Sequence, residues 1–322
     1  MAGGVPGLRR CQRLAGAPAP VARRSGNPAG DRQLAERTVN RWQEPWPAPA
    51  KLNLFLHVTG RRADGYHSLQ TAFRFIDLAD TLHFEPRADG RVTLRRMLAG
   101  VPAERDLCLR AATLLRQATG HQGGVEIDLV KRIPMGGGLG GGSSDAATTL
   151  VALNHLWGLG LKRAQLQRLA LKLGADVPVF VFGENAFAEG VGEELTPLAL
   201  PPAWYLVLVP PVEVPTVAVF AAPELTRMTK TIKITAFFDG LKQRTLRNDL
   251  EPVVCKRYPE VARHLAWLKQ HGEARMSGSG ACVYAEFSTE SAAYAAHAHL
   301  PPAMRGYVAR GLELHPLYEL TE

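Results

Sequence analysis

Residues 134–144 read PMGGGLGGGSS and place six glycines in the seven positions 136–142. The segment before them, residues 125–130, alternates like a strand, and residues 143–145 (Ser-Ser-Asp) are suited to the N-cap and first turn of an Ala-rich helix. Glycine adopts positive φ without steric cost, so successive amide groups of such a loop can converge on one ligand. The helix adds unpaired N–H groups and a dipole that favours negative charge. The stretch therefore predicts a phosphate-binding loop rather than a flexible linker.

Two other phosphate-binding loops can be compared with this one. A Walker A loop ends in Gly-Lys-Ser/Thr, which the stretch lacks. The dinucleotide-binding pattern G-x-G-x-x-G is matched at Gly136, Gly138 and Gly141. That fold also needs an acidic residue about 20 positions later, and residues 146–175 contain none. A dinucleotide-binding oxidoreductase is therefore disfavoured.

The composition is that of an ordinary globular chain. With 322 residues, 46% of them hydrophobic and 21% charged, the chain is long enough for two domains with their own cores. The net charge of +8 is concentrated in residues 1–41, which hold eight arginines and two acidic residues. The rest of the chain is close to neutral, so no nucleic-acid-binding face is indicated. No apolar run reaches the length of a membrane span.

The cysteines Cys11, Cys108, Cys255 and Cys282 lack the paired spacing of a metal site. A disulfide framework is not indicated either, and we expect buried, reduced thiols of a cytoplasmic protein. The sequence identifies no metal ligands and leaves the oligomeric state open.

Residues 1–41 differ from the rest of the chain. They are rich in Gly, Pro, Ala and Arg without an apolar period, which is typical of a disordered basic extension. An organelle transit peptide would share the arginines but would also be rich in serine, and only Ser25 is present. A secretory signal would need an apolar segment, which is missing. We favour an extension that precedes a natural start near Trp42.

Hydrophobic spacing predicts the order of the other elements. Residues 51–58 alternate like a strand with Leu52, Leu54 and Leu56 on one face and Lys51, Asn53 and Phe55 on the other. Helices are expected at residues 107–118, from the glycine loop to about 157, at 162–173, 259–270 and 290–300. Strands are expected at 204–209, 281–287 and 307–314, in a mainly antiparallel pattern. A break near residues 195–202 divides a domain at 42–198 from one at 199–322.

The chain also carries PAKLNLFL at 49–56, RADGYH at 62–67, GADVPVF at 174–180 and SGSGACVY at 277–284. In this order and with the glycine stretch, these motifs resemble the GHMP kinases, which phosphorylate small alcohols such as galactose, homoserine and mevalonate. The resemblance runs from Trp42 to the end of the chain. It implies an α+β, two-domain GHMP kinase fold with a ribosomal-S5-like N-terminal domain and a ferredoxin-like C-terminal domain.

Within this family the chain closely resembles bacterial members of the non-mevalonate pathway to isoprenoids. The resemblance implies that ATP, with Mg²⁺, phosphorylates the 2-hydroxyl of a methylerythritol linked to cytidine diphosphate. A kinase of another small alcohol and a non-catalytic nucleotide-binding protein are the alternatives. The presence of both Lys51 and Asp176 argues against a non-catalytic protein.

The resemblance also implies a catalytic pair. From the residues alone Asp176 could be the N-cap of a short helix, but the family implies a carboxylate that accepts or orients the proton of the acceptor. Lys51, otherwise a solvated lysine of an edge strand, is implied to stabilise the developing alkoxide. Ser143 or Ser144 is expected to contact phosphate or Mg²⁺. The implied ATP-binding residues are Pro134, Met135, Gly136, Gly137, Gly138, Leu139, Gly140, Gly141, Gly142, Ser143 and Ser144.

The acceptor site is implied in the same way, although each of its residues alone could equally belong to the core or the rim. Tyr66 and Phe220 would sandwich the cytosine ring, and His67 and Asn53 would read polar edges of the cytidine or the erythritol. Residues 277–280 (SGSG), by themselves a hairpin turn, are implied to pack against the first glycine loop. The implied acceptor-binding residues are Asn53, Tyr66, His67, Leu69, Phe73, Thr216 and Phe220.

The extension provides a first test. Because residues 1–41 lie outside the resemblance, a chain that starts at Arg41 should keep its full activity and melting temperature. Steady-state kinetics and thermal unfolding of the two chains side by side measure this. A loss in either quantity beyond the measurement error would show that the extension contributes to the enzyme.

Overall fold

The structure, a computed structural model, describes residues 41–243 and 245–321. Two β-sheets organise these residues. These residues belong to one unit, Asn40–Glu322. The extension predicted at residues 1–41 lies outside the described residues except for Arg41. The boundary between residues 42–198 and 199–322 stays a prediction.

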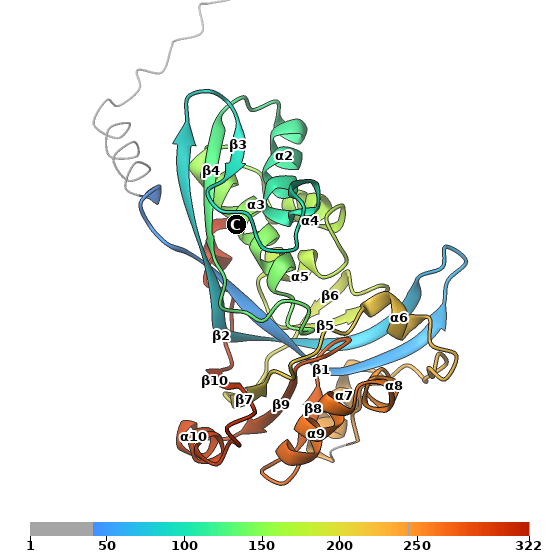
Figure 1. Cartoon of the computed structure of the whole chain (residues 1–322). Helices are drawn as coiled ribbons and strands as arrows, with labels where there is room; N and C mark the ends of the chain where they lie inside the picture. The colour runs from blue at the N-terminus through green and yellow to red at the C-terminus, as the bar shows by residue number, and fades with distance from the viewer. Residues whose placement is uncertain (1–40, 244, 322) are drawn as a thin grey trace, which may run out of the picture. The chain divides into compact units, whose positions relative to one another are not determined.

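The first sheet is built around a long hairpin (Figure 1). Its strands are β1 Trp46–Arg61, β2 His67–Arg87, β3 Val92–Leu94, β4 Gly124–Val130, β5 Ala186–Glu189 and β6 Glu194–Pro197. β2 pairs antiparallel with β1, β4 and β5, while β3 lies parallel to β4 and β6 pairs with β5. The predicted strand at 125–130 is confirmed as β4, and it ends where the glycine loop begins.

The predicted faces of residues 51–58 are wrong for Phe55 and Leu56. The register of β1 against β2 shifts between Asn53 and Leu56, and an inserted residue exchanges the two faces of the strand that follows. Phe55 therefore joins Leu52 and Leu54 in the interior. Leu56 instead lines the same cavity as Lys51 and Asn53.

Helices α2 to α5 cover one face of this sheet (Figure 1). They are α2 Leu107–Thr119, α3 Gly141–Leu156, α4 Arg163–Leu171 and α5 Val177–Phe182. The helices predicted at 107–118, at 162–173 and after the glycine loop are confirmed. Asp106 caps α2, because its carboxylate accepts hydrogen bonds from the backbone N–H groups of Cys108 at 2.9 Å and Leu109 at 3.0 Å.

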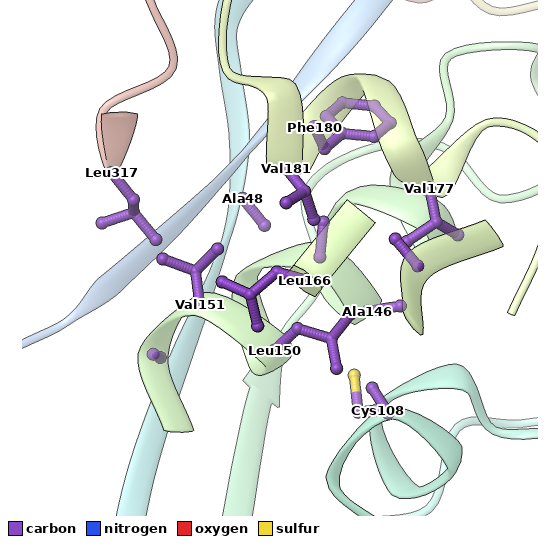
Figure 2. Packing of buried hydrophobic residues seen from close by; sticks show 14 of the residues in the cluster. Ala48, Cys108, Ala146, Leu150, Val151, Leu166, Val177, Phe180, Val181 and Leu317 are labelled. Carbon is purple, nitrogen blue, oxygen red and sulfur yellow. The ribbon is translucent and has the colours of Figure 1, made fainter. Parts of the chain in front are cut away.

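Helix α3 lies at the centre of the first core. Figure 2 shows its Leu150 and Val151 packed among Leu166 of α4, Val181 of α5 and Leu317 near the end of the chain. Burial of such side chains contributes roughly 1.5–3 kcal/mol each. The packing fixes α3, and with it the helix N-terminus that follows the glycine loop.

The second sheet has the strand order β10-β7-β9-β8 and is antiparallel throughout. Its strands are β7 Trp204–Leu208, β8 Ala274–Met276, β9 Val283–Phe287 and β10 Gly306–Arg310. The helices of this half are α6 Thr216–Phe220, α7 Ile234–Lys242, α8 Glu251–Arg257, α9 Pro259–Leu268 and α10 Glu290–Ala298. The β-α-β-β-α-β order is that of a ferredoxin-like domain, as predicted. The strand expected at 307–314 is shorter, because the chain leaves the sheet after Arg310 and returns to the first core.

The two sheets pack face to face. Tyr205 and Val207 of β7 point into a core shared with Leu52 and Leu54 of β1, whereas alternate residues of β7 face the helices of the second half. Within the described residues no helix is long and apolar enough to cross a membrane.

The described cysteines are free thiols, as expected, but they differ in burial. Cys108 and Cys282 are buried, whereas Cys255 is only half-buried, contrary to the prediction. Burial raises the pKa of the Cys255 thiol to about 11 and that of Cys282 to about 12.

Candidate active site

The glycine loop joins the end of β4 to the start of α3. Gly136, Gly138 and Gly140 have φ values of 67°, 76° and 73°, a left-handed conformation that costs other residues about 1–2 kcal/mol. Helix α3 begins at Gly141 with Gly140 as its N-cap. Among the described residues, no side chain makes a capping hydrogen bond to the first N–H groups of this helix.

The expected capping role of residues 143–145 is wrong, since these residues lie inside the first turns of α3. The buried Ser144 hydroxyl donates a hydrogen bond of 2.7 Å to the carbonyl of Pro49 in β1. Ser143 lines two cavities that border the loop. Of the two serines, Ser143 is the one placed to meet a ligand.

A second glycine-containing loop, residues 277–282, packs against the first. The Ser277 hydroxyl donates to the carbonyl of Gly138 at 3.0 Å, and the N–H of Cys282 donates to the carbonyl of Gly137 at 3.0 Å. A Cβ on Gly138 would lie 2.2 Å from the carbonyl oxygen of Ser277. The close approach of the two backbones, which the motifs implied, thus requires glycine.

Lys51 and Asp176 form an ion pair beside the loops. Lys51 Nζ lies 3.2 Å from Asp176 Oδ2 and donates to Asn53 Oδ1 at 2.6 Å. The ammonium group also lies 5.2 Å from the centre of the Phe73 ring, a cation–π distance. Lys51 is tied to the glycine loop by its own N–H, which donates to the carbonyl of Leu139 at 2.9 Å.

The carboxylate of Asp176 is not used as a helix cap. Asp176 stands at the N-cap position of α5, but its side chain accepts no capping hydrogen bond. That side chain is 41% exposed, whereas the side chain of Lys51 is 3% exposed. The carboxylate of Asp176 therefore faces the cavity, with the buried ammonium group of Lys51 beside it.

The side chain of Asn53 makes hydrogen bonds to two described residues. Besides its bond to Lys51, its amide nitrogen donates to Thr71 Oγ1 at 2.9 Å. Thr71 Oγ1 in turn donates to the carbonyl of Phe55, in the bulged part of β1. The side chain of Asn53, itself fixed by Thr71, thus holds the Lys51 ammonium group in place.

The larger cavity, about 750 Å³, brings together every residue predicted for acceptor binding. Tyr66 is 64% exposed on the rim, and Phe73 is buried in the wall. The Phe220 ring stacks on His67 with a centroid separation of 5.1 Å. Thr216 is hydrogen-bonded to the Ser279 hydroxyl at 2.7 Å. Sequence reasoning missed Leu56, Arg61, Thr71, Ser279 and Arg227, which line the same cavity.

A smaller cavity, about 340 Å³, also borders the glycine loop. All the predicted ATP-binding residues except Ser144 line it, together with apolar side chains such as Leu98, Leu107 and Leu129. Gly136, Gly138, Gly140 and Ser143 line both cavities. The two cavities therefore meet at the loop.

A buried cluster of charged side chains, which the sequence did not predict, holds the glycine loop at its two ends. Lys131 contacts both Asp80 and Asp145, and Asp80 Oδ1 also accepts hydrogen bonds from the N–H groups of Arg132 at 2.5 Å and Ile133 at 2.8 Å. Burial raises the pKa of Asp145 to about 8 despite the neighbouring ammonium group. The cluster joins the residues that follow β4 to the N-terminal part of α3, the two ends of the loop.

Two family models match the chain: the GHMP kinases N terminal domain at residues 106–184 and the GHMP kinases C terminal domain at residues 234–304. A 4-diphosphocytidyl-2-C-methyl-D-erythritol kinase of Nitrosospira multiformis is 63% identical over 86% of this chain and 94% of its own length. The chain belongs to the GHMP kinase family. The kinase of the same description from Thiobacillus denitrificans is also 63% identical, over 86% of this chain and 99% of its own length.

Solved structures agree with this assignment. A 4-(cytidine 5'-diphospho)-2C-methyl-D-erythritol kinase aligns with a TM-score of 0.73 and 38% identity, over 83% of this chain and 99% of its own. A mevalonate kinase aligns with a TM-score of 0.60 and 16% identity, over 84% of this chain and 99% of its own, which shows the shared fold alone. The predicted family and α+β kinase fold are confirmed, and this GHMP kinase uses ATP.

The contact between the two loops yields a matched pair of variants. Gly138→Ala would drive a Cβ into the Ser277 carbonyl and displace the loop, and displacements near 1 Å can cost about 100-fold in rate. Gly136→Ala has the same left-handed φ, but nothing lies within 4 Å of its Cβ. We expect Gly138→Ala to lose about 100-fold in kcat/KM and Gly136→Ala to lose far less.

Both variants should be compared by nucleotide titration and thermal unfolding. The common cost of positive φ lowers both melting temperatures, so only the difference between the variants reports the contact. Equal nucleotide affinity and activity in the two variants would mean that the loops can separate without consequence.

Proposed function

We propose that this GHMP kinase transfers the γ-phosphate of ATP to the 2-hydroxyl of 4-diphosphocytidyl-2-C-methyl-D-erythritol, giving the 2-phosphate and ADP. The step belongs to the non-mevalonate pathway to isoprenoid precursors, and we place it in the cytoplasm, in keeping with the free thiols of Cys108, Cys255 and Cys282. The relatives at 63% identity carry the choice of acceptor. The residues of the site support the reaction itself.

The observation that carries the chemistry is the Lys51–Asp176 pair, 3.2 Å between charged atoms, on the wall of the larger cavity. The side chain of Lys51 contacts the glycine loop, because a Cβ on Gly140 would lie 3.0 Å from Lys51 Cε. Gly140 lines both cavities, so a hydroxyl beside this pair lies next to the place where the two cavities meet. Direct, in-line attack on a phosphate held at the loop requires this proximity.

The transfer forms one oxygen–phosphorus bond and breaks another. The 2-hydroxyl hydrogen-bonds to Asp176, which orients it and takes its proton as the oxygen–phosphorus bond forms. The bond from the γ-phosphorus to the bridging oxygen breaks, and ADP leaves with that electron pair. The transition state is stabilised by position and charge rather than by covalent chemistry. Lys51 stabilises the developing alkoxide, and the N–H groups of the loop and of α3 face the phosphates.

The smaller cavity suits the nucleotide. Its apolar wall of Leu98, Leu107 and Leu129 can contact a base, and the glycine loop lies at the phosphate end. Mg²⁺ in such sites is held mainly by phosphate and water, with one or two protein oxygens. Ser143 lines this cavity, and Asp145 Oδ1 is a buried oxygen without a hydrogen-bond partner. These two residues fit the ion, which when bound neutralises charge on the phosphates.

The larger cavity suits the acceptor. Tyr66 and Phe220 lie on its wall, and we propose that they stack on the cytosine. Because His67 already covers one face of the Phe220 ring, the base meets the other face. Leu69 and Phe73 complete the apolar wall, Thr216 binds a polar group of the acceptor, and Asn53 holds Lys51 toward the hydroxyl.

A coupled assay of ADP release tests the function directly. The expected result is ATP turnover that depends on the cytidyl substrate. Turnover with mevalonate or homoserine instead would indicate a GHMP kinase of another small alcohol, and nucleotide binding without turnover on any of these alcohols would indicate a non-catalytic protein. Each alternative thus has its own outcome.

The role of Asp176 is tested by Asp176→Asn. Asparagine keeps the shape, and because the Asp176 side chain makes no capping hydrogen bond, helix α5 should remain intact. The charge that accepts or orients the proton is lost, which typically costs about 10²–10⁴ in rate. We expect a fall of that size in kcat, with ATP affinity and melting temperature nearly unchanged. A variant that keeps more than half of the wild-type kcat would remove Asp176 from the mechanism.

The cytosine sandwich is tested by Tyr66→Ala and Phe220→Ala. Each should weaken binding of CDP by about 1–3 kcal/mol, about 5- to 150-fold in Kd, because one stacking surface is lost. ATP binding should stay within about twofold, and the second truncation should cost less than the first. Tyr294→Ala, which removes another exposed tyrosine (53% against 64% for Tyr66), is the matched control.

Isothermal titration with CDP measures these changes. If both single variants bound CDP as tightly as the wild type does, the sandwich would be wrong. The chain would then be assigned only as a kinase of its family, without a defined acceptor.

A further inference from the structure

Asn185 is a buried residue that lies three positions after α5, outside every sequence motif. Its Oδ1 accepts a hydrogen bond of 2.8 Å from the N–H of Phe75 in β2. Its Nδ2 donates to the carbonyls of Leu312 at 2.8 Å and Glu313 at 3.1 Å, in the segment that follows β10. The side chain of Asn185 thus joins the end of α5 to β2 and to the C-terminal segment.

The bond to Phe75 reaches the strand pair that carries Lys51. Phe75 in β2 lies directly opposite Lys51 in β1. The N–H of Lys51 donates to the glycine loop, at the carbonyl of Leu139. The N–H of Phe75 instead meets Asn185, and its carbonyl accepts from the N–H of Leu312 at 2.8 Å. Opposite residues that bond outward in this way have Cα atoms about 4.5 Å apart. Asn185 therefore holds the residue that lies beside Lys51.

The other charge of the catalytic pair depends on α5. Asp176 stands at the N-cap position of this six-residue helix, and its carboxylate makes no capping bond. The helix backbone therefore decides where the carboxylate lies. At the other end, about 9 Å away at 1.5 Å per residue, the N–H of His315 donates to the carbonyl of Gly183 at 2.8 Å. A packed helix moves as a rigid element, so a shift at this end displaces Asp176.

Side-chain packing connects the same three parts of the chain. Phe180 of α5 packs on Phe75, with ring centroids 5.5 Å apart. Leu317 of the C-terminal segment lies in one core with Val181 of α5 (Figure 2). Helix α5 thus contacts both the strand pair and the C-terminal segment, and Asn185 hydrogen-bonds to both.

We propose that Asn185 is a positioning residue for phosphoryl transfer, because it sets the separation of Lys51 and Asp176, 3.2 Å between their charged atoms. The inference rests on the proposed function, since it concerns the same catalytic pair. Asn185 lines neither of the two cavities that meet at the glycine loop. Its loss should therefore slow the transfer without weakening the binding of either substrate.

The kinetic test is Asn185→Ala, which removes all three hydrogen bonds. Displacements near 1 Å can cost about 100-fold in rate, so we expect kcat to fall by about 10- to 100-fold, with both KM values within about twofold. The matched control is Asn154→Ala. Asn154 is also buried, donates to the carbonyl of Leu161 at 3.0 Å and accepts from its N–H at 2.9 Å, but it lies near the C-terminal end of α3. This control should lower the melting temperature and keep the wild-type kcat.

A double-mutant cycle with Asp176→Asn distinguishes positioning from general damage. If Asn185 acts through the carboxylate of Asp176, its replacement by alanine should cost less than about threefold in kcat once that carboxylate is absent. An equal cost in the wild type and in the Asp176→Asn background would overturn the positioning role.

Asn185→Ser is the milder variant, because a hydroxyl can satisfy one of the three partners. A folded variant of either kind whose kcat stays within twofold of the wild type would overturn the role of Asn185 and leave Asp176 in the mechanism. Failure of both variants to fold would overturn it too, since Asn185 would then be required by the whole fold. Wild-type activity of Asp176→Asn would instead remove the proposed mechanism, and this inference with it.

Discussion

The backbone of Gly138 lies so close to the carbonyl of Ser277 that a Cβ would come within 2.2 Å of it. Through this contact the loop after β4 and the loop before β9 hold one another, although they belong to different sheets. The first loop lines both cavities, and the second completes the wall of the larger one. Both cavities and the position of the Lys51–Asp176 pair therefore depend on the close contact of these two backbones.

Such a loop has little packing of its own and must be held at its ends. One end is bound through the carboxylate of Asp80, which accepts from two successive backbone N–H groups, and the other through Asp145 near the start of α3. Lys131 joins the two carboxylates. Loss of one member would leave a buried charge without its partner, which typically destabilises a protein by about 3–5 kcal/mol. Rigidity of the loop thus comes from charges outside it.

Much of this arrangement could be predicted from local sequence. The glycine stretch, its strand and helix, and the ferredoxin-like order of the second half each depend on short-range patterns. The faces of Phe55 and Leu56 could not be predicted, because the bulge depends on how β1 pairs with β2. Arg227 was missed for a related reason: its bond to His67 joins residues 160 positions apart. Motifs predicted residues that line the two cavities, but not the residues that hold them in place.

Gly136, Gly138 and Gly140 line both cavities, so the two cavities meet at the glycine loop. Two ligands that occupy them are near enough to be joined by a short chemical linker. The second half of such a molecule would bind at the high effective concentration set by the first. The shared glycines therefore also make this enzyme a suitable target for bisubstrate inhibitors.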